Sequence, residues 1–590
     1  MLDRGEDTRR TSAGKSFGPG SVALHATACA LATTPVVHTR QNRAEADIPM
    51  EFDRESSRAA VFDRSWPGSS RAAGALAVLL AVASLAIVLG GVRSTIHDLD
   101  RHAVPKELVL HATALIALLV LVRRWRRLEL DVVQLPLIAF LAWSALSALF
   151  ATSHWIALRA LAITCSGIVI FVTSRFIVRH RGTPIVLAGL AVAAVTGALI
   201  GNLQAWGVEL AWLADDRPPG GTFGNRNFLA HFTAIALPIL LLLGLRARSL
   251  ATTALAAGGL VICMNLLVLT RSRAAWLGAA AALIVFMLAL AIAPALRSRR
   301  APRRLLSMPA ALAAGILLAI ALPNRLEWRS AAPYSETLAR MTDYRQGSGR
   351  GRLIQYRNTL GIVRMDPVLG AGPGNWFVKY PLVTTRDDPS FNPADPIPTN
   401  PWPSSDWLAL LAERGALAVL MVLATGAAML LVAFRRLRGD DADAAPPAAA
   451  LAAVLAATAV TGSFDAVLLN SAPVFLVAVA AGVLLPATRP VIDRPFHGPR
   501  RRATIAGMVA FAVIVTAYSA VQFASIRVTS DARTRATIER AARIDPTSYR
   551  LHLDLARRGN CTARIPHARA AARLLPWHET PREALRRCGQ

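Results

Sequence analysis

The chain has 590 residues, of which 54% are hydrophobic and 17% charged, and its mean hydropathy is +0.41. This balance excludes a soluble enzyme, a disordered chain and a secreted disulfide scaffold, and it indicates that most of the chain lies in lipid. The net charge of +28 raises the question of nucleic acid. However, most arginines fall in short clusters between apolar runs, as they do in membrane proteins, so we expect no nucleic-acid partner.

Residues 1–70 are rich in Arg, Ser, Asp and Ala, and they show neither helical nor strand periodicity. They also lack the charged, apolar and cleavage segments of a signal peptide. We interpret them as a disordered cytoplasmic leader, or in part as sequence upstream of a later start.

From Ala72 onward, apolar runs near the twenty residues that cross a bilayer recur along the chain. They predict an all-α polytopic membrane protein with about 12–13 transmembrane helices, one long extracytoplasmic loop and a small helical-repeat tail. The predicted domains are membrane helices in 71–323 and 406–524, the loop at 324–405, and the tail at 525–590. The predicted spans are 72–92, 108–122, 132–150, 156–174, 184–206, 228–245, 251–269, 274–296, 305–323, 407–433, 447–465, 471–487 and 503–524.

Arginines concentrate in alternate loops, and Lys and Arg accumulate on the cytoplasmic side of membranes. A cytoplasmic N-terminus is the register that places these clusters inside, and it places the long loop and the tail outside. The largest inner clusters are Arg123, Arg124, Arg126 and Arg127; Arg297, Arg299, Arg300, Arg303 and Arg304; and Arg489, Arg494, Arg500, Arg501 and Arg502.

Two polar motifs stand at the outer ends of predicted helices. The first, 218–227, is rich in Gly and ends in Asn225-Arg226-Asn227. Its free amides and Asn side chains suit an anion at a helix N-terminus, although a tight turn with an Asn cap explains the same residues. The second motif contains Arg271 and Arg273, which break the positive-inside trend and are therefore candidates for binding a phosphate. The alternative is a pair of arginines that reach outer lipid headgroups.

The long loop contains Arg350, Arg352, Arg357 and Arg364 with apolar residues at helical spacing between them. This pattern predicts an amphipathic helix on the membrane surface that ends at Asp366-Pro367. Glycines follow at alternate positions in 370–374, where they allow either close approach to a ligand or a plain turn.

The next predicted helix opens with Ser404, Ser405 and Asp406, and either serine can cap it. Glu413 lies inside this apolar span, so it is either paired with an arginine or functional. Asp465, at the outer end of the following helix, raises the same question.

The order of these motifs on one face resembles the O-antigen ligase family, over roughly residues 72–490. The motifs are Asn225 to Ala230, Thr270 to Trp276, Arg352 to Gly372, Asp406 to Gly415, and Phe464-Asp465 followed by Pro473. The resemblance implies a multi-spanning glycosyltransferase that uses no metal and no other cofactor. It would move a glycan from a polyprenyl-diphosphate carrier to an acceptor hydroxyl of a lipid, a glycan or a protein. The transfer would take place on the extracytoplasmic face of the inner membrane.

The resemblance also implies roles for single residues. Arg271 or Arg273, together with Arg352 or Arg357, would bind the diphosphate, with Asn225, Arg226, Asn227 and Asp465 nearby. Family members carry a His eleven residues before a Gly as the base, but here Ser404 stands eleven residues before Gly415. Either Asp406 or Glu413 is then the base, or the acceptor differs, or this copy is inactive.

In the tail, the pattern Ala-Ala-Arg-Ile-Asp-Pro of 541–546 recurs in altered form at 571–576. It resembles a degenerate tetratricopeptide pair, which would pack on the membrane domain or on a partner protein; the alternative is two unrelated helices. Cys561 and Cys588 can form a disulfide if the tail lies outside the cytoplasm. Two other classes of function stay open: a flippase for the same lipid-linked glycan, and an inactive envelope scaffold.

Overall fold

The computed structural model describes residues 69–590, except for 95, 124, 181, 211–216, 298–305, 329, 386–387, 390–401, 531–533 and 590. The expected leader therefore lies outside the described residues, apart from its last two positions, where the first described helix begins.

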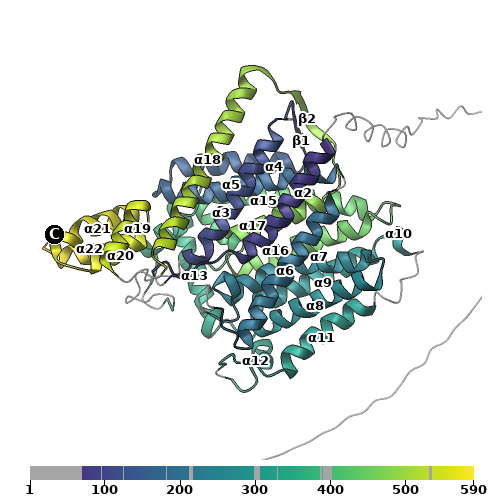
Figure 1. Ribbon diagram of the computed structural model, residues 1–590, viewed down its shortest axis with the longest axis horizontal. Coiled ribbons are helices and arrows are strands. Elements are labelled where there is room, and N and C mark those ends of the chain that lie inside the picture. Colours follow the sequence, from purple (N-terminus) through teal and green to yellow (C-terminus); the bar gives the residue numbers. More distant parts are fainter. Residues whose placement is uncertain are drawn as a thin grey trace, which may run out of the picture. The chain divides into compact units, whose positions relative to one another are not determined.

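Each of the thirteen predicted spans corresponds to a helix, which confirms the all-α membrane fold (Figure 1). Three of the helices are shorter than a full span: α4 (Gln134–Leu149), α11 (Ser307–Ala321) and α17 (Ser471–Leu484). Ten are long and apolar enough to cross a membrane: α2 (Ser69–Leu89), α3 (Asp100–Leu121), α5 (His154–Val178), α6 (Thr183–Ala205), α7 (Arg226–Arg246), α8 (Leu250–Thr270), α9 (Arg273–Ala291), α15 (Asp406–Leu437), α16 (Ala445–Phe464) and α18 (Gly498–Val528).

Helix α7 is the most enclosed of the long helices and α18 the least. In the apolar window of α7, 83% of the residues are buried, against 11% in α18. A helix at the edge of a bundle faces lipid instead of other helices, so the low burial of α18 is typical of a peripheral helix. Helix α7 instead packs against α6, α8, α9 and α16, so its first residues lie at the centre of one end of the bundle.

A two-stranded antiparallel ribbon, which the sequence did not lead us to expect, joins β1 (Arg127–Asp131) to β2 (Pro490–Pro495). Arg127 and Asp493 form an ion pair across it at 2.7 Å. The buried Arg175 anchors the ribbon through Asp131 at 3.0 Å and the Leu485 carbonyl at 2.8 Å. We call this end of the bundle, which carries the arginines of 126–127 and 489–502, the ribbon end.

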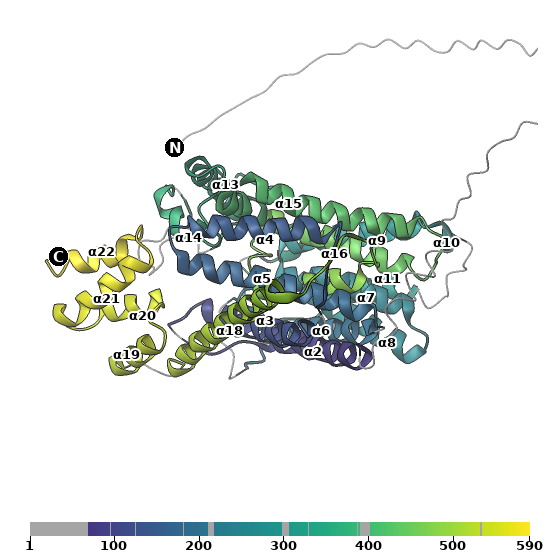
Figure 2. The same ribbon diagram turned by 90° about the horizontal axis from the view of Figure 1, so that it is seen from above.

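The opposite end, which we call the loop end, carries the long loop and the tail. The loop forms α12 (Pro333–Ala339), α13 (Gly347–Met365) and α14 (Trp376–Lys379). Figure 2 shows α13, α14 and the tail helices at one end of the bundle and the short α10 (Pro294–Arg297) at the other.

Helix α13 ends where the sequence predicts, with Asp366 at its C-cap. Its protein-facing side is polar, with Gln355, Asn358 and Thr359 buried beside Ile362. Leu353 and Leu360 of the predicted apolar side are exposed, which leaves them free to contact lipid.

The glycines of the 370–374 turn approach the protein's own backbone. A Cβ on Gly370 would lie 2.2 Å from the Glu413 carbonyl carbon, and one on Gly372 would lie 2.3 Å from the Ala151 Cβ. In return, Gly415 interrupts the helical backbone of α15 with φ 76°, where a Cβ would meet the Val368 carbonyl at 1.8 Å. These glycines allow the loop to pack closely against the rest of the protein. Of the two alternatives for 370–374, close approach to a ligand or a plain turn, this packing agrees with the plain turn.

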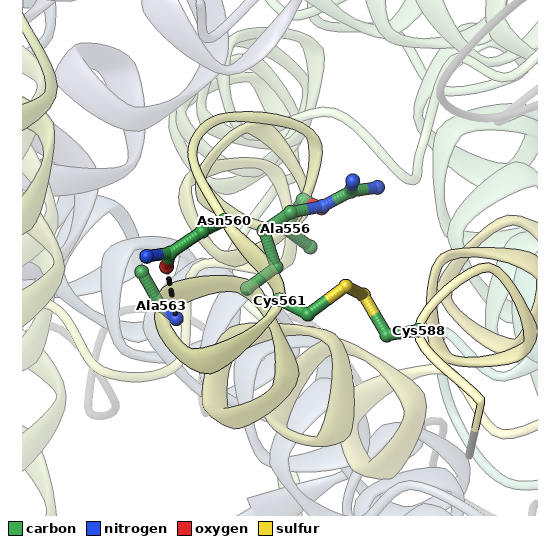
Figure 3. Close-up of a disulfide and its surroundings, with 6 residues drawn as sticks. Ala556, Asn560, Cys561, Ala563 and Cys588 are labelled. Carbon is green, nitrogen blue, oxygen red and sulfur yellow. Dashed lines mark hydrogen bonds between the residues drawn. A yellow bond between two sulfur atoms is a disulfide. The ribbon is translucent and has the colours of Figure 1, made fainter.

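The tail forms two helical hairpins, α19 (Arg535–Ile544) with α20 (Tyr549–Arg557) and α21 (Cys561–Leu574) with α22 (Glu579–Arg586). The two recurring sequence patterns occupy equivalent places, the ends of α19 and α21. Cys561 and Cys588 form a disulfide that joins the start of α21 to the end of the tail, beside the capping contact of Asn560 with Ala563 (Figure 3).

The tail packs on the membrane domain. Of the two expected arrangements, packing on the membrane domain or on a partner protein, this is the first. Tyr549 and Leu553 of α20 share a hydrophobic cluster with Val378 of α14. Arg550 forms an ion pair with Asp98 at 3.1 Å. These side-chain contacts fix the first hairpin to the loop end.

Candidate functional site

Two of the predicted arginines contact the ring of one tryptophan. The guanidinium carbons of Arg226, at the start of α7, and Arg271, at the end of α8, each lie 4.8 Å from the ring centroid of Trp328. Arg271 also donates to the Thr337 hydroxyl at 2.7 Å and lies 3.5 Å from the Glu336 carboxylate. The first turn of α7 and the α8–α9 junction are therefore brought together by the loop.

A second pair of arginines joins α9 to α13. Arg273 donates to the Ser348 hydroxyl at 2.8 Å and to the Arg340 carbonyl at 2.5 Å. The positive charge of Arg273 also interacts with that of Arg352, which lies one turn after Ser348 on α13. Both side chains are only half buried, so an anion that reaches the loop end has access to them.

Tyr356 lies beside Arg352 and between the loop and α16. Its hydroxyl lies at hydrogen-bond distance from the carbonyls of Ser404, at 3.0 Å, and Ser463, at 2.9 Å. Burial raises the pKa of Tyr356 to about 12, while the charge of Arg352 acts to lower it and that of Asp465 to raise it. The phenol therefore stays protonated and ties α13 to the 402–405 segment and to the end of α16.

The Asn-Arg-Asn motif serves partly as a cap and partly as a bridge. Asn225 is the N-cap of α7, where its side chain accepts from the Asn227 amide at 2.9 Å. The side chain of Asn227 reaches the Asp465 carboxylate at 3.5 Å. The other oxygen of Asp465 accepts from the Ala466 amide at 2.9 Å. This bridge joins the first turn of α7 to the end of α16.

Asp406 is buried and fully engaged with backbone. Its two carboxylate oxygens accept from the amides of Val467, at 2.9 Å, and Leu468, at 2.8 Å. Gly462 makes room for the carboxylate, because a Cβ there would lie 2.7 Å from the Asp406 Oδ2. In this arrangement Asp406 holds the α16–α17 loop, and Ser405 caps α15 by accepting from the Leu408 amide.

Glu413 has a similar environment. Its carboxylate accepts from the amides of Gly374, at 2.8 Å, and Trp376, at 3.2 Å. The neighbouring Arg414 donates instead to the hydroxyls of Ser144 and Thr164. Glu413 thus fixes the 370–376 turn against α15.

Most of the predicted site residues therefore gather at the loop end, and a few stand apart. Arg226, Arg271, Arg273, Arg352, Asn227 and Asp465 form a connected group. We call Arg226, Arg271, Arg273 and Arg352 the arginine cluster. Arg357 is exposed on α13, and Ser404 contributes its backbone amide and carbonyl, which contact Gln355 and Tyr356.

Three residues of this region were not predicted from the sequence: Trp328, Tyr356 as a polar contact, and His231. A Trp in a basic loop and a His four residues after Asn227 are visible in the sequence, but many loops and helices carry such residues. Among the described ranges, no group of three or more His, Cys, Asp and Glu side chains is arranged to hold a metal ion. The expectation of metal-independent chemistry remains a prediction.

Comparison with known families finds a match to the O-antigen ligase family (Wzy_C) over residues 258–423. The matched segment runs from α8 through the long loop into α15, so it includes Arg271, Arg273, Arg352, Asp406 and Glu413. No curated protein matches the chain.

Proposed function

Because the chain is an O-antigen ligase-like membrane protein, we propose that it transfers a glycan from a polyprenyl-diphosphate carrier to an acceptor hydroxyl. The reaction takes place on the extracytoplasmic face of the inner membrane. The observation that carries this proposal is the convergence of the arginine cluster from α7, the α8–α9 junction and α13 at one end of the bundle.

A cluster of guanidinium groups is suited to a diphosphate. Guanidinium forms paired, charge-assisted hydrogen bonds with phosphate oxygens and keeps its charge at any physiological pH. Like charges held together repel one another, so an anion between them is favoured. Trp328 and Thr337 hold Arg226 and Arg271 in place before any ligand arrives. A site of this kind stabilises charge that develops during reaction without reorganising.

The reaction is a substitution at the first carbon of the glycan. The acceptor oxygen forms a bond to this carbon as the bond from the carbon to the diphosphate oxygen breaks. The leaving diphosphate keeps the electron pair, and the arginine cluster offsets its new charge. The acceptor proton passes to a base. Asp406, Glu413 and Ser404 stay the candidates from the sequence, but both carboxylates already accept two backbone amides.

Two observations support an extracytoplasmic loop end. The arginines of 126–127 and 489–502 lie at the ribbon end, which the positive-inside rule assigns to the cytoplasm. The disulfide between Cys561 and Cys588 belongs to the tail, and disulfides persist in oxidising compartments. Both observations support an arginine cluster on the extracytoplasmic side, where the proposed transfer takes place.

The test is deletion of the gene in its host, followed by analysis of surface polysaccharide and of polyprenyl-diphosphate-linked glycan. The strain is then complemented with wild type, Arg273→Ala, Arg352→Ala or Arg364→Ala. Arg364 lies on the exposed side of α13 and is the matched control for loss of one arginine. We expect lipid-linked glycan to accumulate on deletion. Loss of one cluster arginine should lower the transfer rate by about 10²–10³-fold, whereas Arg364→Ala should restore it.

An unchanged glycan profile in the deletion strain contradicts the transferase proposal and favours the scaffold. If the protein is a flippase, the deletion strain should accumulate the lipid-linked glycan on the cytoplasmic side. An external glycosidase would then not reach it. Equal activity of Arg352→Ala and Arg364→Ala contradicts the role of the arginine cluster.

A further inference from the structure

His231 is a buried histidine that the proposed function does not yet use. It lies in the second turn of α7, with 1% of its surface exposed. Both of its ring nitrogens are buried without a hydrogen-bond partner. A neutral imidazole carries one donor and one acceptor, so both of its polar groups are unsatisfied.

Such a residue is unfavourable for stability alone. Each buried polar group without a partner costs about 1–3 kcal/mol. An apolar side chain of similar size would fill the same space without this cost. Orphaned polar groups in a native core therefore call for an explanation, such as a water, a ligand or a catalytic role.

His231 lines a cavity of about 40 Å³, together with Lys106, Asn470 and Ser471. This volume and its polar groups suit a few water molecules or the hydroxyl of a bound molecule. Glu107 and Trp402 also line a second cavity of about 270 Å³, so the two cavities adjoin.

The second cavity lies between the membrane domain and the tail. Its lining combines aromatic and charged side chains, namely Trp155, Trp376, Tyr518, Asp100, Arg159 and Asp545. Rings that present an apolar face, next to carboxylates that accept hydroxyl protons, suit a hydroxyl-rich ligand such as a sugar. An acceptor in this cavity would direct a hydroxyl toward the smaller one.

His231 also adjoins the arginine cluster. Asn227 and His231 are four residues apart and share one face of α7, and Asn227 contacts Asp465. The charges of Asp465 and Arg352 both act on the His231 ring. The histidine is thus near the arginine cluster and also lines the cavity.

We propose that His231 takes the proton from the acceptor hydroxyl, an inference that rests on the proposed transfer reaction. One ring nitrogen of neutral His231 accepts the hydroxyl proton as the oxygen bonds to the glycan carbon. The diphosphate leaves with the electron pair of the broken bond. The imidazolium that forms lies near the Asp465 carboxylate, and its proton then passes to water in the cavity. This assigns the base to α7, where its nitrogens are unoccupied, in place of the engaged carboxylates of Asp406 and Glu413.

The experiment compares wild type, His231→Phe and His231→Ala in membrane vesicles of the deletion strain. The vesicles supply the accumulated lipid-linked glycan and the native acceptor. Transfer is measured at pH 7.5, with and without added imidazole. A general base contributes about 10²–10⁴-fold, so we expect His231→Phe to lose that factor. It should accumulate in the membrane as well as wild type. Imidazole should restore His231→Ala in part, because the truncation enlarges the cavity.

Transfer by His231→Phe within threefold of wild type overturns the assignment and leaves the transfer reaction standing. Absence of transfer in wild-type vesicles counts against the proposed function itself. Should His231→Phe fail to accumulate, His231→Ala decides: rescue by imidazole supports the assignment. Failure of rescue at wild-type protein levels contradicts it.

Discussion

The carboxylate of Asp406 accepts a hydrogen bond from the backbone amide of Val467, 61 residues along the chain. The contact joins the first turn of α15 to the loop between α16 and α17. A residue that appears in the sequence as a candidate base is thus part of the framework of the site.

Replacement of Asp406 should therefore affect stability as well as activity. In Asp406→Ala the buried amides of Val467 and Leu468 lose their acceptor, which costs about 1–3 kcal/mol for each group left unsatisfied. Asp406→Asn keeps one acceptor oxygen and should lose about half as much. Thermal unfolding in detergent measures both. If Asp406→Asn unfolds like wild type yet abolishes transfer, Asp406 acts in catalysis rather than in the framework.

Gly415 should tolerate no side chain. Its φ of 76° opposes alanine, and so does the Val368 carbonyl, which would lie 1.8 Å from an alanine Cβ. We expect Gly415→Ala to lower the free energy of unfolding by about 1–3 kcal/mol or to reduce accumulation in the membrane. Gly426 is the matched control on the same helix, since a Cβ there would meet nothing within 4 Å. Gly426→Ala should be neutral or stabilising by about 0.5–1 kcal/mol. Equal effects of the two changes would contradict the packing of the loop on α15.

The tail disulfide should stabilise the second hairpin. It closes a loop with a sequence separation of 27 residues, and disulfides of this kind contribute about 2–4 kcal/mol. Cys588→Ser should therefore increase hydrogen exchange in α21 and α22 of the full-length protein, while α7 stays protected. The Cys165→Ser change, on α5, is the control.

The disulfide also predicts that a membrane-impermeant thiol reagent labels intact cells only after reduction. Labelling of Cys561 without reduction would contradict the pairing.

Docking of the tail should weaken in acid. His578 is 1% exposed and packs against the ring of Phe377 at 5.1 Å, and burial lowers its pKa to about 4. The unfolded chain then binds the proton more readily, so stability is full above pH 6.5 and falls as the pH drops toward 4. The loss at pH 5 is about 2 kcal/mol. Hydrogen exchange of α20 and α22 at pH 7.5 and pH 5 measures it.

His578→Phe is the control for this pH effect, because it fills the aromatic contact without titrating. Burial raises the pKa of Asp545, at the same boundary, so this carboxyl acts in the opposite direction. The difference between wild type and His578→Phe isolates the histidine. Identical pH dependence of the two proteins would show that His578 does not set it.

The sequence predicts the membrane helices well because each span must satisfy its own backbone in lipid, and this requirement is local. The same holds for the end of α13 at Asp366 and for the cap at Ser405. The ribbon of β1 and β2 was missed because its strands are separated by more than 350 residues. Polar and apolar residues alternate in β1, but only over five residues, and β2 shows no such alternation.

The candidate site was predicted in part. Charged residues at helix ends are visible in the sequence, so the arginines and Asp465 were found. What each side chain contacts depends on segments far along the chain, such as Trp328 for Arg226 and Val467 for Asp406. The orphaned state of His231 appears only when its neighbours are known, because a single His in an apolar helix is usually a packed core residue.

Helix α18 is held at both of its ends. At the ribbon end Arg501 donates to the carbonyls of Trp125 and Val122, and at the loop end Ser525 donates to the carbonyl of Ala541 in the tail. With 31 residues it spans about 46 Å as a single rod. The angular position of the tail is therefore set by the number of residues between these two attachments. Insertion of a single residue in the lipid-facing middle of α18 would turn its last residues by about 100°, and Ser525 would no longer face α19. The two attachments thus constrain the length of α18, whereas its lipid-facing residues need only be apolar.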